Sequence, residues 1–186
     1  QTGGREAAGM RTLILGGARS GKSRLAERLA ADSGLRVVYI ATAGGGDAEM
    51  RERIEIHRQR RPSHWQTVEA PLRLAATLRA NAADDVCVLV DCLTLWLSNL
   101  LCAEGAEDLE TEREALLQLL PALPGRVLMV SNETGLGVVP LGALSRRFVD
   151  EAGWLHEAVA ERSEQVILTV AGLPHVLKGG ALVRPE

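Results

Sequence analysis

The sequence predicts an α/β fold built on a mostly parallel central sheet, and three observations support this prediction. Short apolar runs alternate with segments of helical periodicity along the 186 residues. The apolar runs are rich in Val, Ile and Leu and contain no regular polar alternation, which is typical of strands buried on both faces. Glycine-rich stretches follow two of these runs, as expected where a parallel sheet forms a ligand site beyond the carboxyl ends of its strands.

The expected elements follow one another in the order of an alternating fold. The apolar runs predict strands over Thr12–Leu15, Leu35–Ala41, Val86–Val90, Arg126–Val130 and Gln165–Val170. The periodic segments predict helices over Lys22–Asp32, Asp47–Arg60, Pro71–Asn81, Leu93–Cys102, Leu109–Leu120 and Leu141–Arg162. The loops Thr42–Gly46 and Asn132–Pro140 both follow strands and are candidate walls of the site. We expect a single domain over residues 10–186.

Composition and charge exclude several classes of protein. The net charge of -3, without a long basic run, gives no general attraction for nucleic acid or for an anionic membrane. Polar residues interrupt the longest apolar stretch, near Val86–Cys102, so we expect no membrane span. We expect no signal peptide and a cytoplasmic location, with Cys87, Cys92 and Cys102 as small core residues in a reducing compartment. Residues 1–9 are expected to be an extension outside the fold.

The most informative motif is GGARSGKS over Gly16–Ser23, which fits G-x-x-x-x-G-K-[ST] between an expected strand and an expected helix. Its glycines allow backbone N–H groups to point at phosphate oxygens, and the helix N-terminus adds partial positive charge. Lys22, one of only two lysines among 21 basic residues, is predicted to reach the β and γ phosphates, and Ser23 to bind Mg²⁺. A glycine-rich turn that merely packs tightly is the alternative. The motif predicts a three-layer P-loop NTPase fold of the RecA-like type.

Asp91 is a second candidate for the phosphate site. It ends the apolar run VCVLVD, so a buried strand would deliver its carboxylate beside the phosphate loop, where it can hold Mg²⁺ or a water bound to the ion. The alternative is that Asp91 only caps the helix that begins at Leu93. The presence of the phosphate motif favours the role in the site.

A local positive patch surrounds a histidine in the segment DAEMRERIEIHRQRRP. Five arginines fall within residues 51–61. On a helix, Met50, Ile54 and His57 would share one face, where a histidine is more often a core residue than a catalyst. However, a neutral imidazole beside arginines that neutralise phosphate oxygens can also attack phosphorus directly. His57 is therefore a candidate nucleophile, and His64 is a weaker candidate.

Five segments together resemble one enzyme family. In chain order they are GGARSGKSRLAERLA, VVYIATA, DAEMRERIEIHRQRRPSHWQTVE, VLVDCLTLWLSNLL and SNETGLGVVP. They resemble the bifunctional adenosylcobinamide kinases and adenosylcobinamide-phosphate guanylyltransferases of cobalamin biosynthesis, and the match covers nearly everything after Met10. The phosphate loop alone fits many families, whereas the H-R-x-x-R-P-x-H-W block and N-E-x-G-x-G-x-V-P are far more specific.

This resemblance implies two reactions at one nucleotide site. First, GTP or ATP phosphorylates the hydroxyl on the aminopropanol arm of adenosylcobinamide. Then GMP passes from GTP to adenosylcobinamide phosphate through a GMP-histidine intermediate, which gives adenosylcobinamide-GDP and pyrophosphate. The family's histidine falls on His57, and the residue before it, a second histidine in many relatives, is Ile56 here. The resemblance also implies a homotrimer, for which the apolar segment Leu93–Leu101 is a candidate interface.

The resemblance further implies which residues contact the nucleotide. They are Gly16, Gly17, Ala18, Arg19, Ser20, Gly21, Lys22 and Ser23, then Ala41, Thr42 and Ala43, then Arg58, Gln59, Arg60 and Arg61, and finally Glu69 and Asp91. Lys22 and His57 are implied as catalytic residues. Ser23 and Asp91 are implied as ligands of Mg²⁺.

Two other functions are compatible with parts of the sequence. A P-loop kinase of another small alcohol would need the phosphate loop but no histidine nucleophile. A GTP-binding regulatory module would be expected to carry an N-K-x-D motif, which the sequence lacks. Neither the corrinoid contacts nor a general base for the kinase step is identified by the sequence.

Overall fold

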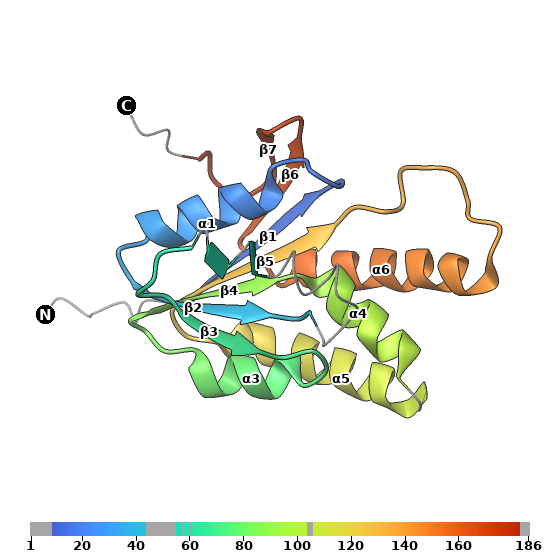
Figure 1. The fold of residues 1–186 in the computed structure, drawn as a ribbon, viewed down its shortest axis with the longest axis horizontal. Coiled ribbons are helices and arrows are strands. Elements are labelled where there is room, and N and C mark those ends of the chain that lie inside the picture. The colour runs from blue at the N-terminus through green and yellow to red at the C-terminus, as the bar shows by residue number, and fades with distance from the viewer. Residues whose placement is uncertain (1–8, 44–54, 57, 60, 104–105, 183–186) are drawn as a thin grey trace, which may run out of the picture.

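The computed structural model describes residues 9–43, 55–56, 58–59, 61–103 and 106–182, and these form a three-layer α/β fold (Figure 1). The middle layer is a seven-stranded sheet with the order β3-β2-β4-β5-β1-β6-β7. Every neighbouring pair is parallel except β6 and β7. The predicted mostly parallel sheet is therefore confirmed.

The five strands predicted from apolar runs are all present. The strands are β1 (Met10–Gly16), β2 (Arg36–Ala41), β3 (Gln66–Glu69), β4 (Val86–Asp91), β5 (Arg126–Asn132), β6 (Gln165–Val170) and β7 (Leu173–Lys178). Strands β3 and β7, which lie at the two edges of the sheet, were not predicted from the sequence. Their side chains are mostly exposed, so neither strand carries the continuous apolar run that marks a buried strand.

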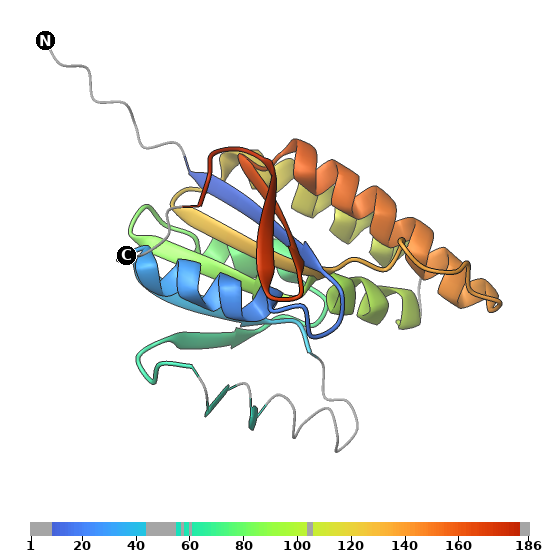
Figure 2. The same cartoon turned by 90° about the horizontal axis from the view of Figure 1, so that it is seen from above.

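Helices cover both faces of the sheet, as Figures 1 and 2 show. Helix α1 lies on one face, and the remaining long helices lie on the other. Their bounds are α1 (Lys22–Asp32), α3 (Leu74–Asn81), α4 (Leu93–Cys102), α5 (Ala106–Leu119), the short 3-10 helix η1 (Leu120–Ala122) and α6 (Ala143–Glu161). Of the helix predicted over Asp47–Arg60, residues 47–54, 57 and 60 lie outside the described residues, while 55–56 and 58–59 are helical.

Helix α3 begins at Leu74, three residues later than the predicted start at Pro71. The backbone carbonyls before it are turned toward α4. The indole N–H of Trp96 donates to the carbonyl of Leu72 at 2.8 Å, and the amide of Asn99 donates to the carbonyl of Pro71 at 3.0 Å. These contacts join α4 to the segment that follows β3.

The inner strands are buried on both faces, which explains their uninterrupted apolar sequences. In β4, Val86, Val88 and Val90 belong to the core under α3 to α6, while Cys87 and Leu89 belong to the core under α1. Each fully buried side chain of this size contributes roughly 1.5–3 kcal/mol to stability. The strand that ends at Asp91 is therefore held firmly in the sheet.

Two expectations about buried residues are wrong. Cys102, the last residue of α4, is exposed, so it is not a core residue, unlike the buried Cys87. The apolar side chains of α4 that were expected at a subunit interface are instead largely used by the chain's own core. Leu93, Trp96 and Leu97 are each no more than 1% exposed, because they pack toward the sheet and the neighbouring helices.

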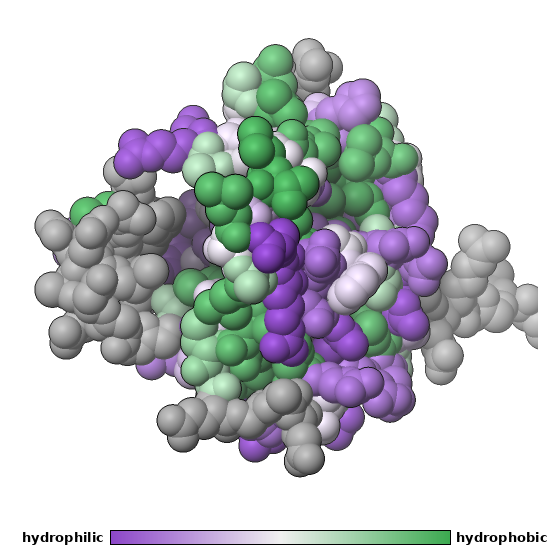
Figure 3. Space-filling model, turned by 90° about the vertical axis from the view of Figure 1, so that its right-hand side faces the viewer, coloured by the Kyte–Doolittle hydropathy of each residue, from purple (hydrophilic) through white to green (hydrophobic). Residues whose placement is uncertain are grey.

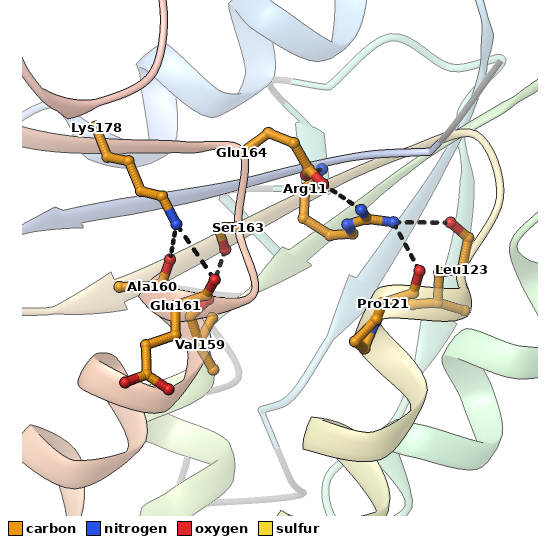
Figure 4. Close-up of polar contacts among 9 residues, drawn as sticks. All are labelled: Arg11, Pro121, Leu123, Val159, Ala160, Glu161, Ser163, Glu164 and Lys178. Carbon is orange, nitrogen blue, oxygen red and sulfur yellow. Dashed lines mark hydrogen bonds and ion pairs between the residues drawn. The ribbon is translucent and has the colours of Figure 1, made fainter. Parts of the chain in front are cut away.

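Arg11 joins β1, β6 and the η1 turn at the amino ends of the strands (Figure 4). It is 8% exposed, and its guanidinium donates to the carbonyls of Pro121 and Leu123, both at 3.3 Å. The same guanidinium forms an ion pair with Glu164, whose carboxylate also accepts the Arg11 N–H at 2.6 Å. One buried side chain thus connects three parts of the chain.

We expect Arg11→Met to lower the free energy of unfolding by about 3 kcal/mol at pH 7, because it removes the charged donor of two carbonyls. Urea unfolding followed by circular dichroism measures this loss. Arg36→Met is a matched control, because the Arg36 ion pair with Asp85 is exposed and 4.0 Å long. Its expected cost is within about 1 kcal/mol. Equal losses in the two variants would contradict the role of Arg11.

The loss in free energy of unfolding caused by Arg11→Met is also expected to depend on pH. Burial raises the pKa of Glu164, but hydrogen bonds from Arg11 outweigh it and the pKa lies below its ordinary value. Such a carboxylate stabilises the fold above its unfolded pKa, about 4.3, and this stabilisation is lost as pH falls through the folded value. The stability gap between wild type and Arg11→Met should therefore narrow below about pH 4. An unchanged gap would contradict the ion pair's contribution.

Candidate functional site

The phosphate motif forms a loop at the carboxyl end of β1, which continues directly into α1. Gly16 must be glycine, because a Cβ there would lie 2.3 Å from the Ser20 hydroxyl and 2.8 Å from the Thr169 carbonyl. Gly21 has φ 92°, a left-handed conformation that favours glycine, at the position before the first residue of α1. Gly17, Ala18 and Arg19 are exposed, so a ligand can approach this part of the loop.

Lys22 reaches back over this loop. Its amino group donates to the carbonyl of Gly17 at 3.0 Å, and the residue is only 9% exposed. Burial lowers the pKa of Lys22, while the nearby Cys92 and Asp91 act in the opposite direction. The amino group therefore lies over the phosphate loop and within electrostatic reach of the Asp91 carboxylate. Ser23 follows in the first turn of α1 and is half-buried.

The Asp91 carboxylate is held by Tyr39, and Arg61 in turn packs on the Tyr39 ring. The Tyr39 hydroxyl donates to Asp91 Oδ2 at 2.6 Å, and Tyr39 is 4% exposed. The guanidinium of Arg61 lies 3.7 Å from the centre of the Tyr39 ring. Burial, together with the Asp91 charge, raises the pKa of Tyr39, so the phenol stays protonated and donates. Asp91 does not cap α4, because Cys92 occupies that position and its Sγ accepts the N–H of Leu95.

Thr42 organises the backbone between β2 and α4. It is fully buried, its hydroxyl donates to the Cys92 carbonyl at 2.7 Å, and the same oxygen accepts the Cys92 N–H at 2.9 Å. The Asn99 amide donates to the Thr42 carbonyl at 2.7 Å. Ala41 is buried beside Thr42, whereas Ala43 is half-buried. The hydroxyl of Thr42 is thus used to join two strand ends.

The remaining predicted nucleotide contacts come from the edge of the sheet. Glu69 ends β3 and is exposed, and it pairs in register with Ala41. Arg58 and Gln59 are exposed, whereas Arg61, which packs against the Tyr39 ring, is only 9% exposed. His57 and Arg60 lie outside the described residues. The structure therefore connects Arg61 to Asp91 through Tyr39, and Asp91 lies within electrostatic reach of Lys22 in the phosphate loop.

The turn between β6 and β7 supports the phosphate loop and was not predicted from the sequence. The N–H of Gly172 donates to the Ser20 carbonyl at 2.8 Å, and a Cβ on Gly21 would lie 3.2 Å from the Cα of Gly172. Ala171 and Gly172 both have positive φ, of 52° and 76°. An Ala-Gly pair is a weaker hairpin signal than Asn-Gly, which is why the sequence did not reveal the turn.

Comparison with known proteins decides the family. The model of the family described as cobinamide kinase / cobinamide phosphate guanyltransferase matches residues 12–177, which include the phosphate loop, the His57 segment and Asp91. The chain belongs to this family. It is an enzyme of cobalamin biosynthesis with kinase and guanylyltransferase activities, as the sequence predicted. The two alternative functions, a kinase of another alcohol and a regulatory module, are not needed.

Similar curated proteins match most of the chain. The bifunctional adenosylcobalamin biosynthesis protein CobP of Pseudomonas aeruginosa is 69% identical over 173 residues, which cover 93% of this chain and 100% of the relative. The CobU proteins of Salmonella typhimurium and Escherichia coli are 38% and 39% identical, each over 88% of this chain and 97% of the relative. A solved structure from Pyrococcus horikoshii OT3, 8% identical, covers 91% of this chain and 86% of its own with a TM-score of 0.54, a likeness of fold alone.

No helix in the described ranges is long and apolar enough to cross a membrane.

Proposed function

We propose that GTP binds at the carboxyl edge of the sheet with its phosphates in Gly16–Ser23, and that ATP can replace it in the kinase step. The position of Lys22 supports this most directly, because its amino group lies over the loop and beside Asp91. A cation in this place stabilises the charge that develops on the leaving phosphates. Arg58, Gln59 and Glu69 then extend the contact surface along the edge of the sheet.

We propose Ser23 and Asp91 as the protein ligands of Mg²⁺. Within the described residues, no cluster of three or more His, Cys, Asp or Glu side chains could hold a metal ion. This fits Mg²⁺, which usually takes one or two protein oxygens together with substrate phosphates and water. Ser23 follows Lys22 in the chain and Asp91 lies within electrostatic reach of Lys22, so the Ser23 hydroxyl and the Asp91 carboxylate would supply these oxygen ligands. When bound, the ion would neutralise phosphate charge during both transfers.

Tyr39 is expected to orient the Asp91 carboxylate for this ion. Tyr39→Phe keeps the ring that faces Arg61 but removes the hydroxyl that donates to Asp91. We expect the Mg²⁺ concentration for half-maximal activity to rise about tenfold, the usual effect of losing such a supporting hydrogen bond. Thr67→Val, which removes an Arg61 contact at 3.4 Å and leaves Tyr39 intact, is the control. An unchanged Mg²⁺ requirement in Tyr39→Phe would contradict this role.

We propose that the guanylyl transfer proceeds through His57. A nitrogen of the neutral imidazole attacks the α-phosphorus of GTP, and the bond from this phosphorus to pyrophosphate breaks. Lys22, Arg58 and Arg61 stabilise the departing charge. The phosphate of adenosylcobinamide phosphate then attacks the same phosphorus, and the phosphorus–nitrogen bond breaks. The product is adenosylcobinamide-GDP, and the histidine is regenerated.

We further propose that one cytoplasmic domain over residues 10–186 assembles as a homotrimer. Support comes from the loop between β5 and α6, where Leu136, Val138, Val139 and Leu141 are 72–98% exposed. Figure 3 shows apolar side chains gathered on the face that carries this loop. Monomeric proteins rarely expose adjacent apolar side chains to this degree. Sedimentation as a monomer at micromolar concentration would contradict the assembly.

The experiment that tests the proposed function is a multiple-turnover assay. The full chain is incubated with adenosylcobinamide, GTP and Mg²⁺, and the corrinoid products are separated by chromatography. We expect adenosylcobinamide phosphate to form first and adenosylcobinamide-GDP to follow, with one pyrophosphate released for each guanylyl transfer. If only adenosylcobinamide phosphate accumulates, the kinase activity is supported but the proposed guanylyl transfer is contradicted.

A further inference from the structure

Glu133 lies at the carboxyl edge of the sheet directly after β5. In the sheet, β5 lies between β1, which leads into the phosphate loop, and β4, which ends at Asp91. The N–H of Glu133 donates to the carbonyl of Gly16 at 3.0 Å. The backbone of Glu133 is therefore attached to the first residue of the phosphate loop, on the side that faces Asp91.

The carboxylate of Glu133 is also fixed locally. Its Oε1 accepts the N–H of Gly135 at 2.7 Å, and the residue is half-buried. One carboxylate oxygen is thus bound to the backbone. This contact sets the direction of the group.

Side chains from two helices hold the end of β5, which directly precedes Glu133. The hydroxyl of Thr94, at the start of α4, accepts the N–H of Asn132 at 3.1 Å. The hydroxyl of Ser131 shares a hydrogen bond of 2.6 Å with Nε2 of His156 on α6, and both residues are buried. Burial lowers the pKa of His156, while the charge of the nearby Glu133 acts in the opposite direction, so this imidazole is neutral at neutral pH. The end of β5 is therefore a rigid support.

The other described carboxylates that end strands at this edge are less suited to take a proton from the substrate hydroxyl in the kinase step. Asp91 accepts the hydrogen bond of Tyr39 and is assigned to Mg²⁺ above. Glu69 ends the edge strand β3, which β2, β4 and β5 separate from β1. By strand order, Glu133 is the carboxylate next to the phosphate loop.

We propose that Glu133 is the general base of the kinase step. The proton of the acceptor hydroxyl passes to the Glu133 carboxylate while the acceptor oxygen forms a bond to the γ-phosphorus. The bond between the γ-phosphorus and the bridging oxygen breaks, and the nucleoside diphosphate leaves with that electron pair. The guanylyl transfer needs no such base, because its acceptor is already a phosphate anion. This inference rests on the proposed position of the triphosphate in Gly16–Ser23.

Glu133→Gln tests this role with little disturbance of the fold. The glutamine carbonyl can still accept the Gly135 N–H but cannot take up a proton. We expect the kinase kcat to fall about 10²- to 10⁴-fold, the usual contribution of a positioned base. Guanylyl transfer to supplied adenosylcobinamide phosphate should continue at the wild-type rate. Glu133→Asp, which retains a carboxylate, should keep more kinase activity than Glu133→Gln.

Glu110→Gln, on the exposed face of α5, is the control for removal of one surface charge and should leave both rates unchanged. An undiminished kinase rate in Glu133→Gln would overturn the proposal. An equal fall in both reactions would also overturn it, because Glu133 would then only support the phosphate loop. If wild type itself does not transfer GMP, the proposed function fails, independently of Glu133.

Discussion

Replacing His57 with alanine is expected to abolish guanylyl transfer while the kinase step continues. The variant lacks the nitrogen that would carry GMP, whereas the phosphate loop and Lys22, proposed to serve the kinase step, are unchanged. Removal of a covalent nucleophile costs many orders of magnitude, on the scale of about 10⁶-fold. Chromatography of the corrinoid products should therefore show adenosylcobinamide phosphate accumulating without adenosylcobinamide-GDP.

His64→Ala is the matched control for His57→Ala. His64 is exposed in the turn before β3, seven positions after His57, and was the weaker candidate for the nucleophile. We expect this variant to keep both activities. If His64→Ala stops guanylyl transfer and His57→Ala does not, the assignment of the nucleophile is wrong.

Replacing Lys22 with methionine is expected to reduce both reactions by at least about 10²- to 10³-fold, the usual effect of removing one preorganised charge from a transition state. The kinase step loses the cation beside the β and γ phosphates, and the guanylyl transfer loses the cation beside the departing pyrophosphate. Separate assays, one with adenosylcobinamide and one with supplied adenosylcobinamide phosphate, measure the two losses.

The chain contains a natural control for Lys22, because Lys178 is its only other lysine. Lys178 lies in β7 and donates to the carbonyls of Ala160 and Glu161 at the end of α6 (Figure 4). Lys178→Met should therefore cost some stability and leave the activities unchanged. A Lys22→Met enzyme that lost only one reaction would contradict a single phosphate site for both.

The sequence revealed the parts of the fold whose burial is continuous. The run VCVLVD is apolar throughout because both faces of β4 are covered, and the bounds of α1 and α4 were predicted to the residue. The edge strands have one neighbour and mostly exposed side chains, so QTVE and LPHVLK do not look like strands locally. They form because β2 and β6 offer unpaired backbone groups beside them.

The candidate site was predictable where one motif carries the chemistry. The phosphate motif is recognised from the spacing of Gly16, Gly21 and Lys22, which lie close together in the sequence. The strand end at Asp91 is recognised from the apolar run that precedes it. In contrast, the bond between Tyr39 and Asp91 joins residues 52 positions apart. The place of Glu133 depends on β5 lying between β1 and β4, an order that no local pattern encodes.

The central claim is that one site forms a covalent GMP-enzyme at His57, and GTP labelled at the α-phosphorus tests it most directly. After incubation without corrinoid, the denatured protein should carry label that is lost in acid and retained in base, as a phosphoramidate requires. Proteolysis should place this label on the peptide that contains His57. Adding adenosylcobinamide phosphate before denaturation should remove it. A protein without label, or with label on another peptide, would contradict the claim.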